Sequence, residues 1–323
     1  MAITLADAKL NTQDDIVKGV IDEFAKSSYI MNNLTFDNSV TPGTNAGTLT
    51  YGYTRLITQP TADFRAVNSE YTDANVEKQR YTADLKPFGG SFSIDRVLAG
   101  TGGLVDEINL QIQQKVKAAS TLFSDTVING DSATNANSFD GLNKAISGSS
   151  TEYGNSVFED ISAVGAHNEF LDKLDEFLAS LDGKPSFLAG NTKLIIKIKS
   201  IARYAGYYTR SENAFGQTVD AYNGIPLVDL GAKAGSDNPI VSIVSTRKPD
   251  GTNVVTGLTD LYAVRLGLDG FHGISLASKP LIQTWMPDFT TAGAVKKGEV
   301  EMVAAVALKS TKAAGIFRNI KVQ

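Results

Sequence analysis

The residues that most often carry catalytic or metal chemistry are few in this chain of 323 residues. It has two histidines, His167 and His272, and no cysteine. His167 precedes Asn168 and Glu169, which is not the HExxH spacing of a zinc protease, and we predict that His272 is a strand residue with a hydrogen-bonded ring. The chain has no GxSxG nucleophile elbow. A Ser-His-Asp triad built from distant residues stays open, but no motif supports one.

Oxygen ligands for a cation gather in residues 129–140. The side chains concerned are Asn129, Asp131, Asn135, Asn137 and Asp140. This segment lacks the Gly at position six and the Glu at position twelve of an EF-hand loop. Asn and Asp side chains also bond their own backbone in turns. The sequence therefore favours a polar turn over a calcium site.

Two further segments have the composition of binding sites. One segment has three glycines just before a predicted helix, namely Gly100, Gly102 and Gly103. The N-terminus of a helix is a place where phosphate can bind. LAGTGGLVDE has neither GK[ST] nor a complete GxGxxG, so a flexible joint explains it as well. The other has basic residues that could face DNA: Lys193, Lys197, Lys199 and Arg203. A solvated helix face is the favoured interpretation there. Trp285 and the pair Tyr207 and Tyr208 suit either a core or an interface.

Composition excludes several classes of protein. The formal net charge is -5, which argues against strong general binding of nucleic acid, because such binding needs Lys and Arg to neutralise phosphates. Without cysteine there is no disulfide or thiolate site, which suits a reducing cytoplasm. We expect no secretory signal and no membrane contact, because no apolar run reaches the ~20 residues that span a bilayer. The length predicts one or two domains.

Apolar residues at steps of three and four predict one long helix over residues 104–128. They are Val105, Ile108, Ile112, Val116, Ala119, Phe123 and Val127. At 1.5 Å per residue this helix is about 37 Å long. Asn129 and Gly130 are expected to end it, because Gly accepts the left-handed conformation of many helix termini.

A long β-ribbon is predicted before this helix. A helix at 15–31 comes first, then alternating strands at 49–57 and 81–85. Between the strands, residues 65–80 are polar and charged, which predicts a charged tip. Because an isolated ribbon is marginal in water, something outside its own domain must support it.

The second half mixes helices with short strands. Helices are predicted at 170–181 and 191–203, the second capped by Asn191 or Thr192 and ended before Gly206. Strands are predicted at 225–230, 240–244, 261–268 and 299–308, with a polar surface loop at 232–239. We find no internal repeat, and the fold class is α+β.

Several segments together resemble one family. They are FRAVNSEYT, LKPFGG, LFSDTVINGDSATNANSFDGLNKA, YNGIPLVDLG and GEVEMVAAVALKSTKAAGIFRNIKV. In order and spacing over nearly the whole chain they resemble the major capsid (head) proteins of tailed phages, with the Hong Kong phage capsid fold. The resemblance implies an N-terminal arm and helix (1–45), an extended β-ribbon loop (46–97), a peripheral domain with the spine helix (98–157 and 288–323) and an axial α/β domain (158–287).

The resemblance implies a structural function with no catalytic residue, cofactor or metal. Copies would assemble into hexamers and pentamers of an icosahedral head around double-stranded DNA, in the host bacterial cytoplasm, and remain in the virion. Expected partners are the chain itself, portal and scaffolding proteins, optionally a cement protein, and DNA by weak nonspecific contact. The first alternative is an encapsulin-type shell around a cargo enzyme. The second is a hydrolase with an unrecognised carboxylate site.

Contacts between subunits are expected at two places. On the ribbon they are Arg65, Glu70, Asp73, Glu77, Lys78 and Arg80, and on the loop near the capsomer axis they are Lys233 and Asp237. Some family members join a ribbon Lys to an Asn of a neighbour. Lys78 could serve, but residues 294–301 contain no Asn, and Asn319 is misplaced. The first predicted helix begins by residue 15, so we expect a separate scaffolding protein or earlier trimming.

Overall fold

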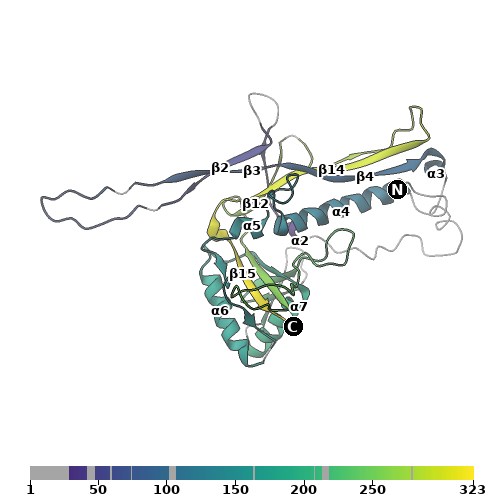
Figure 1. The fold of residues 1–323 in the computed structure, drawn as a ribbon. Helices are drawn as coiled ribbons and strands as arrows, with labels where there is room; N and C mark the ends of the chain where they lie inside the picture. The colour runs from purple at the N-terminus through teal and green to yellow at the C-terminus, as the bar shows by residue number, and fades with distance from the viewer. Residues whose placement is uncertain are drawn as a thin grey trace.

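The computed structural model describes residues 29–41, 48–58, 60–73, 75–101, 107–162, 164–206, 208–212, 218–277 and 279–323. It has three parts: a protruding ribbon, a long sheet with a helix beside it, and a lower part of sheet and helices (Figure 1). The predicted helix at 15–31 lies mostly outside the described residues. Helix α2 (Tyr29–Asn33) includes its last part. None of the described helices has the length and apolar character needed to cross a membrane.

The long sheet is organised around one strand. Its strands are β1 (Phe36–Val40), β4 (Lys86–Asp95), β12 (Phe271–Leu276), β13 (Ile282–Trp285) and β14 (Val295–Leu308). Strand β14 pairs antiparallel with β4, β12 and β13, and β1 adds parallel to β12. Because β14 is long, it pairs with different strands at different points along its length.

The spine helix α4 (Glu107–Asn129) lies beside β4 and β14, as Figure 1 shows. The short helix α3 (Arg96–Gly100) precedes it. Within α4, Ala119, Phe123 and Val127 are buried, and the Phe123 ring lies 6.0 Å from Phe88 and 5.8 Å from Phe139. The predicted helix and its apolar stripe are confirmed in the C-terminal half, while residues 107–118 are only partly buried or exposed.

The turn after α4 depends on close approach, not on left-handed backbone. Gly130 does not have a positive φ, so that part of the prediction is wrong. A Cβ at Gly130 would lie 2.3 Å from the Phe139 carbonyl oxygen, and one at Gly141 would lie 2.5 Å from that of Thr126. The Gly141 N–H donates to the Gly130 carbonyl at 2.9 Å. Helix α5 (Leu142–Ile146) follows directly.

The lower part is built on an eight-stranded sheet. Its strands are β5 (Glu152–Tyr153), β6 (Glu159–Asp160), β7 (Phe187–Gly190), β8 (Tyr208–Glu212), β9 (Thr218–Tyr222), β10 (Ile225–Asp229), β11 (Leu258–Val264) and β15 (Ala314–Lys321). The order is β5-β15-β11-β7-β10-β9-β8, with β6 also paired to β15. Helices α6 (His167–Ala179) and α7 (Thr192–Ala205) share an apolar core with one face of this sheet. Side chains along a strand alternate between the two faces of a sheet. In β11, Leu261 therefore packs in the core with α6 and α7, and Tyr262 packs in the core that includes α4.

Capping signals in the sequence correctly predicted both ends of α7. The Asn191 side chain accepts a hydrogen bond from the Lys193 N–H at 3.0 Å, and Gly206 ends the helix at φ 80°. By contrast, the predicted strand at 240–244 is wrong. Ile240 and Val241 are buried, but only Val244 forms an isolated bridge, to Leu258.

Sheet membership differs from the predicted domain grouping. The closing segment divides, because β14 belongs to the long sheet and β15, after the 3-10 turn η2 (Thr311–Ala313), belongs to the lower sheet. Strands β12 and β13, grouped with the axial domain, lie in the long sheet. The sequence of a strand does not say which sheet it joins, because the choice depends on distant pairing partners. The division into peripheral and axial domains stays a prediction.

Gly141→Ala tests the tight turn. Its added methyl meets backbone oxygen, so we expect it to lower the free energy of unfolding by about 1–3 kcal/mol, as overpacking does. Gly100→Ala is the control, because a Cβ there meets nothing within 4 Å. Urea denaturation measures both. Equal midpoints for the two variants would contradict a turn held by close approach.

Candidate interaction surfaces

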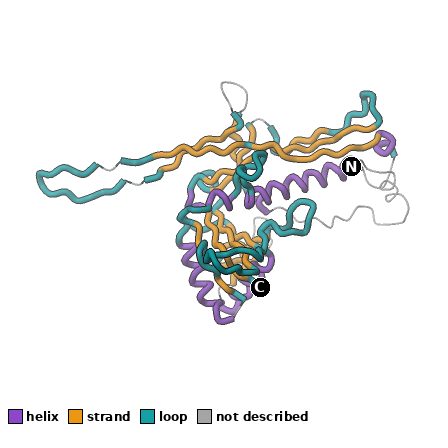
Figure 2. Tube along the Cα trace, viewed as in Figure 1, coloured by secondary structure: helices purple, strands orange, loops and turns teal. Residues whose placement is uncertain are grey.

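The ribbon is formed by two strands and a long extended loop. Strands β2 (Thr50–Leu56) and β3 (Lys78–Asp84) pair antiparallel from Thr50–Asp84 to Leu56–Lys78, which confirms the predicted ribbon. Beyond them the Ile57 N–H donates to the Glu77 carbonyl at 2.8 Å. Figure 2 shows this loop projecting far from the rest of the chain. All described residues from 56 to 80 are exposed.

The structure places the predicted ribbon contacts on this exposed segment. Arg65, Glu70, Asp73, Glu77, Lys78 and Arg80 are all exposed. The Arg65 guanidinium lies 5.3 Å from the centre of the Tyr71 ring and donates to the Ser69 carbonyl. Among the described residues, no ion pair involves any of these six side chains. Their charges are therefore available to a partner.

The ribbon also exposes apolar side chains that the sequence reasoning missed. Phe64 is 108% exposed and Val67 is 90% exposed. Both lie in FRAVNSEYT, whose charges suggested a purely polar tip. A large apolar side chain on an outlying loop has no core of its own chain to enter. Such a surface is typical of a contact site.

The inner end of the ribbon is anchored. The Tyr53 hydroxyl donates to the Leu308 carbonyl at 3.0 Å, and Arg55 Nε donates to the Lys309 carbonyl at 2.9 Å. The same guanidinium lies 4.3 Å from the centre of the Tyr81 ring, which stacks on Tyr53 at 5.9 Å. Burial raises the pKa of Tyr53, so its hydroxyl keeps its proton. These contacts fix the direction in which the ribbon leaves the rest of the chain.

His272 lies beside Tyr51, at the inner end of the ribbon. It is a buried strand residue, as predicted, and among the described residues no partner of either ring nitrogen meets strict hydrogen-bond geometry. A backbone group of Gly270 lies within reach of the ring and acts to raise its pKa, so the hydrogen-bonded ring stays a prediction. The Tyr51 ring packs edge-on at 5.8 Å, while its hydroxyl donates to Asp37. Burial and the nearby Lys309 lower the pKa of His272, so the ring is neutral at pH 7.

The loop predicted near the capsomer axis is a compact turn. Ala232 and Pro239 form a bridge, and the Lys233 N–H donates to the Asn238 carbonyl at 2.8 Å. Lys233 Nζ lies 3.3 Å from Asp125 of α4, so one predicted contact residue is engaged within its own chain. Asp237 is exposed.

The polar turn after α4 is confirmed. Lys144 Nζ lies 2.5 Å from Asp131 and 3.2 Å from Asp140, where a cation would have to sit. Hydrogen bonds from Lys144, Ala133 and Thr134 lower the pKa of Asp131 to about 2. Within the described ranges, no cluster of three acidic or histidine side chains could hold a metal ion.

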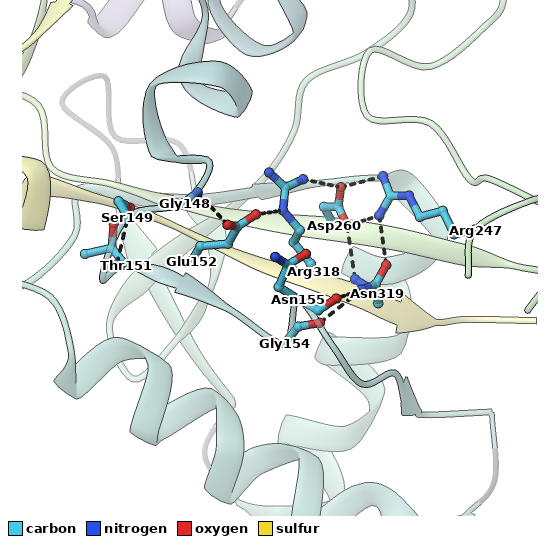
Figure 3. Close-up of polar contacts among 10 residues, drawn as sticks. All are labelled: Gly148, Ser149, Thr151, Glu152, Gly154, Asn155, Arg247, Asp260, Arg318 and Asn319. Carbon is cyan, nitrogen blue, oxygen red and sulfur yellow. Dashed lines mark hydrogen bonds and ion pairs between the residues drawn. The ribbon is translucent and has the colours of Figure 1, made fainter. Parts of the chain in front are cut away.

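A network of buried charges joins strands β5, β11 and β15 (Figure 3). Asp260, 4% exposed, accepts a hydrogen bond from Arg247 at 2.7 Å and from the Asn319 N–H at 3.1 Å, and Arg318 lies 3.6 Å away. Arg318 also pairs with Glu152, which accepts from the Gly148 N–H at 2.7 Å. Both carboxylates therefore have arginine partners. This arrangement is typical of a structural network.

The remaining residues singled out in the sequence give little evidence of a functional site. Gly102, Gly103 and Tyr207 lie outside the described residues. His167 begins α6, and its Nε2 is buried without a hydrogen bond. Trp285, at the end of β13, is 46% exposed, which removes the core interpretation and leaves the interface one as a prediction.

Comparisons with known proteins identify the fold. No protein-family model and no curated protein matches the sequence. The holo-SrpI encapsulin complex from Synechococcus elongatus PCC 7942 matches with a TM-score of 0.65 and 14% identity, over 100% of this chain and 98% of that one. The capsid of the native GTA particle gives 0.61 and 11%, over 95% and 94%. Mycobacterium phage Adephagia gives 0.60 and 12%, over 100% and 99%. The chain has the phage capsid fold that the resemblance implied.

His272 predicts a pH dependence of stability. With its pKa lowered in the folded state, the folded chain binds fewer protons than the unfolded chain below the ordinary His value. Stability should therefore fall as the pH drops from 7 towards 5, by at most about 1.4 kcal/mol per pH unit for one proton. His272→Phe keeps an aromatic ring beside Tyr51 and removes the titration.

Thermal unfolding of both proteins from pH 7 to 5 measures this effect. We expect the variant to have a flatter profile than the wild type. Parallel profiles would show that acid sensitivity arises elsewhere, for example from the carboxylates of the buried network.

Proposed function

We propose that the protein is a major capsid protein that self-assembles into hexamers and pentamers of an icosahedral phage head enclosing double-stranded DNA. The observation that carries the proposal is the ribbon, whose tip exposes Phe64 and Val67 far from any core of its own chain. In a protein of the phage capsid fold, burial of this tip requires another copy. Burying apolar side chains is the main favourable term in most protein association.

The alternative is an encapsulin-type shell around a cargo enzyme. An encapsulin is among the similar structures, so the fold alone does not separate the two. Most of the other similar structures are named as phages or as capsids, which favours a phage head. The two proposals differ in what the shell encloses. We propose no enzymatic activity, and no observation favours the hydrolase.

The proposed partners follow from assembly of a head. They are other copies of the chain, portal and scaffolding proteins, and optionally a cement protein, with assembly in the host cytoplasm and a final place in the virion. Contact with packaged DNA would be weak and nonspecific, in keeping with the net charge of -5. We further propose that the ribbon charges, together with Asp237 and Lys233, set register between neighbours.

Light scattering and sedimentation of the purified protein at rising concentration and varied salt test the proposal. We expect large closed particles or discrete capsomers. A monomer that persists at high concentration under all salt conditions would contradict it.

Deleting residues 67–78 should leave the subunit folded but impair assembly, because the tip has no contact with the core that it could disturb. A milder pair of variants separates ribbon contacts from general surface effects. Val67→Asp should impair assembly, whereas Val254→Asp, at a residue 56% exposed on the lower part, should not. The unfolding midpoint and the assembled fraction are measured for each. Normal assembly of the deletion variant would make the tip an ordinary exposed loop.

The shell should be held by noncovalent contacts alone. Residues 294–301 offer Lys78 no Asn, and Asn319 is buried in the network around Asp260, where its amide donates to the Gly154 carbonyl. Denaturing electrophoresis of mature particles should give one band near 34.4 kDa. A ladder of multimers that survives boiling in detergent would refute this.

A further inference from the structure

The two helices on the lower sheet have outer faces of opposite charge. The exposed acidic side chains of α6 are Glu169, Asp172, Asp175 and Glu176. The single basic residue of this helix, Lys173, is held by Glu159 at 2.7 Å and Glu169 at 2.9 Å. Helix α7 has no acidic residue and carries Lys193, Lys197, Lys199 and Arg203. One subunit therefore presents an acidic helix and a basic helix, which lie on the same face of the lower sheet (Figure 1).

The basic face of α7 also exposes large apolar side chains. Ile196 is 59% exposed and Tyr204 is 86% exposed. They are eight residues apart, so they lie on one side of the helix, next to Lys193 and Lys197. The favoured interpretation from sequence was a solvated face, and a solvated face gives no reason for Ile196 and Tyr204. Aromatic and apolar groups among basic ones are typical of a protein contact.

The acidic face of α6 has an apolar neighbour of its own. A hollow of about 480 Å³ opens beside Asp175, and its walls include Leu178, Leu181 and Pro185, with one basic side chain, Lys184. Tyr222, in the adjacent strand, donates its hydroxyl to Asp175 at 2.8 Å, which fixes that carboxylate at the rim. This face therefore offers negative charge and apolar surface together. Apart from Lys184, this face is complementary to α7 in both respects.

We propose that the basic face of α7 docks against the acidic face of α6 in the next copy of the chain. The proposal rests on the assembly function proposed above and names the surfaces used within a capsomer. Because the two faces are different, the contact is head-to-tail, and head-to-tail contacts close into rings when the rotation allows. Complementary charge aligns the copies, and Ile196 and Tyr204 lose water against the hollow.

Contacts within the subunit favour a protein partner over DNA for α7. Lys193 already donates to Gln323, and Lys199 pairs with Asp220, so basic side chains of this face are engaged in their own chain. Phosphate binding would draw on the lysines and make no use of Ile196 or Tyr204. A copy of α6 uses both the charges and the apolar side chains.

Charge reversal with restoration tests the proposal in full-length protein. Lys193→Glu with Lys197→Glu should lower the yield of assembled particles by about tenfold or more, and so should Glu169→Lys with Asp172→Lys, because attraction becomes repulsion. All four together should restore the yield to within about twofold of the wild type. Lys279→Glu, an exposed reversal outside α6 and α7, is the control and should assemble normally. Unfolding midpoints show that each variant folds.

Disulfide trapping gives a second measurement that does not depend on charge. Because the chain has no cysteine, each copy can carry one at a chosen place. Copies with Lys197→Cys, co-assembled with copies with Asp172→Cys and mildly oxidised, should give a disulfide dimer on a nonreducing gel. Particles of either variant alone should give little dimer.

The outcomes separate this proposal from the proposed function. One outcome is that the wild type forms shells, the variant with all four substitutions stays defective and no mixed disulfide dimer forms. The proposed α6–α7 contact would then be wrong, while the capsid function would stand. If the α7 reversal lowers binding of a double-stranded DNA probe and leaves assembly unchanged, α7 faces DNA and the proposal is overturned. A wild type that forms no particle overturns the capsid function itself.

Discussion

The pairing of β14 with β4 fixes the positions of the spine helix, the ribbon and the lower part. At this pairing a Cβ on Gly89 would lie 1.9 Å from the Val300 carbonyl oxygen, so the strands can approach only because residue 89 is glycine. Strand β4 continues into α3 and the start of α4, while the end of β14 receives the Tyr53 hydroxyl from the ribbon. The chain then turns through η2 into β15, which joins the lower sheet. One strand thus links all three parts.

This arrangement leaves the subunit with surfaces that it cannot satisfy alone. The ribbon is anchored by hydrogen bonds of Tyr53 and Arg55, whereas Phe64 and Val67 near its tip are exposed to solvent. The lower part carries two helices of opposite charge. A stable single molecule would hide or balance such features, whereas a subunit that meets copies of itself in fixed orientations can use each of them. The buried network around Asp260 has the opposite character, because its charges are matched within the chain.

Sequence reasoning succeeded where the signal is local. The stripe that includes Phe123, the cap at Asn191 and the stop at Gly206 each act within a few residues, so α4 and α7 could be predicted closely. Contacts between distant residues could not. The pairing of Arg247 and Asp260 with Asn319, the packing of His272 against Tyr51, and the different sheets joined by β14 and β15 all depend on which strands meet. The ribbon contacts were expected to be charged, and the exposed Phe64 was missed because its charged neighbours dominated the pattern.

The central claim is that this subunit is complete only in a closed shell. Electron microscopy of the purified protein tests it most directly, because an image shows the size of a particle and its contents together. The account predicts closed icosahedral particles built from hexamers and pentamers, empty or filled with DNA. Shells that enclose a protein cargo would identify an encapsulin, and a field of single subunits with no particles would contradict the account.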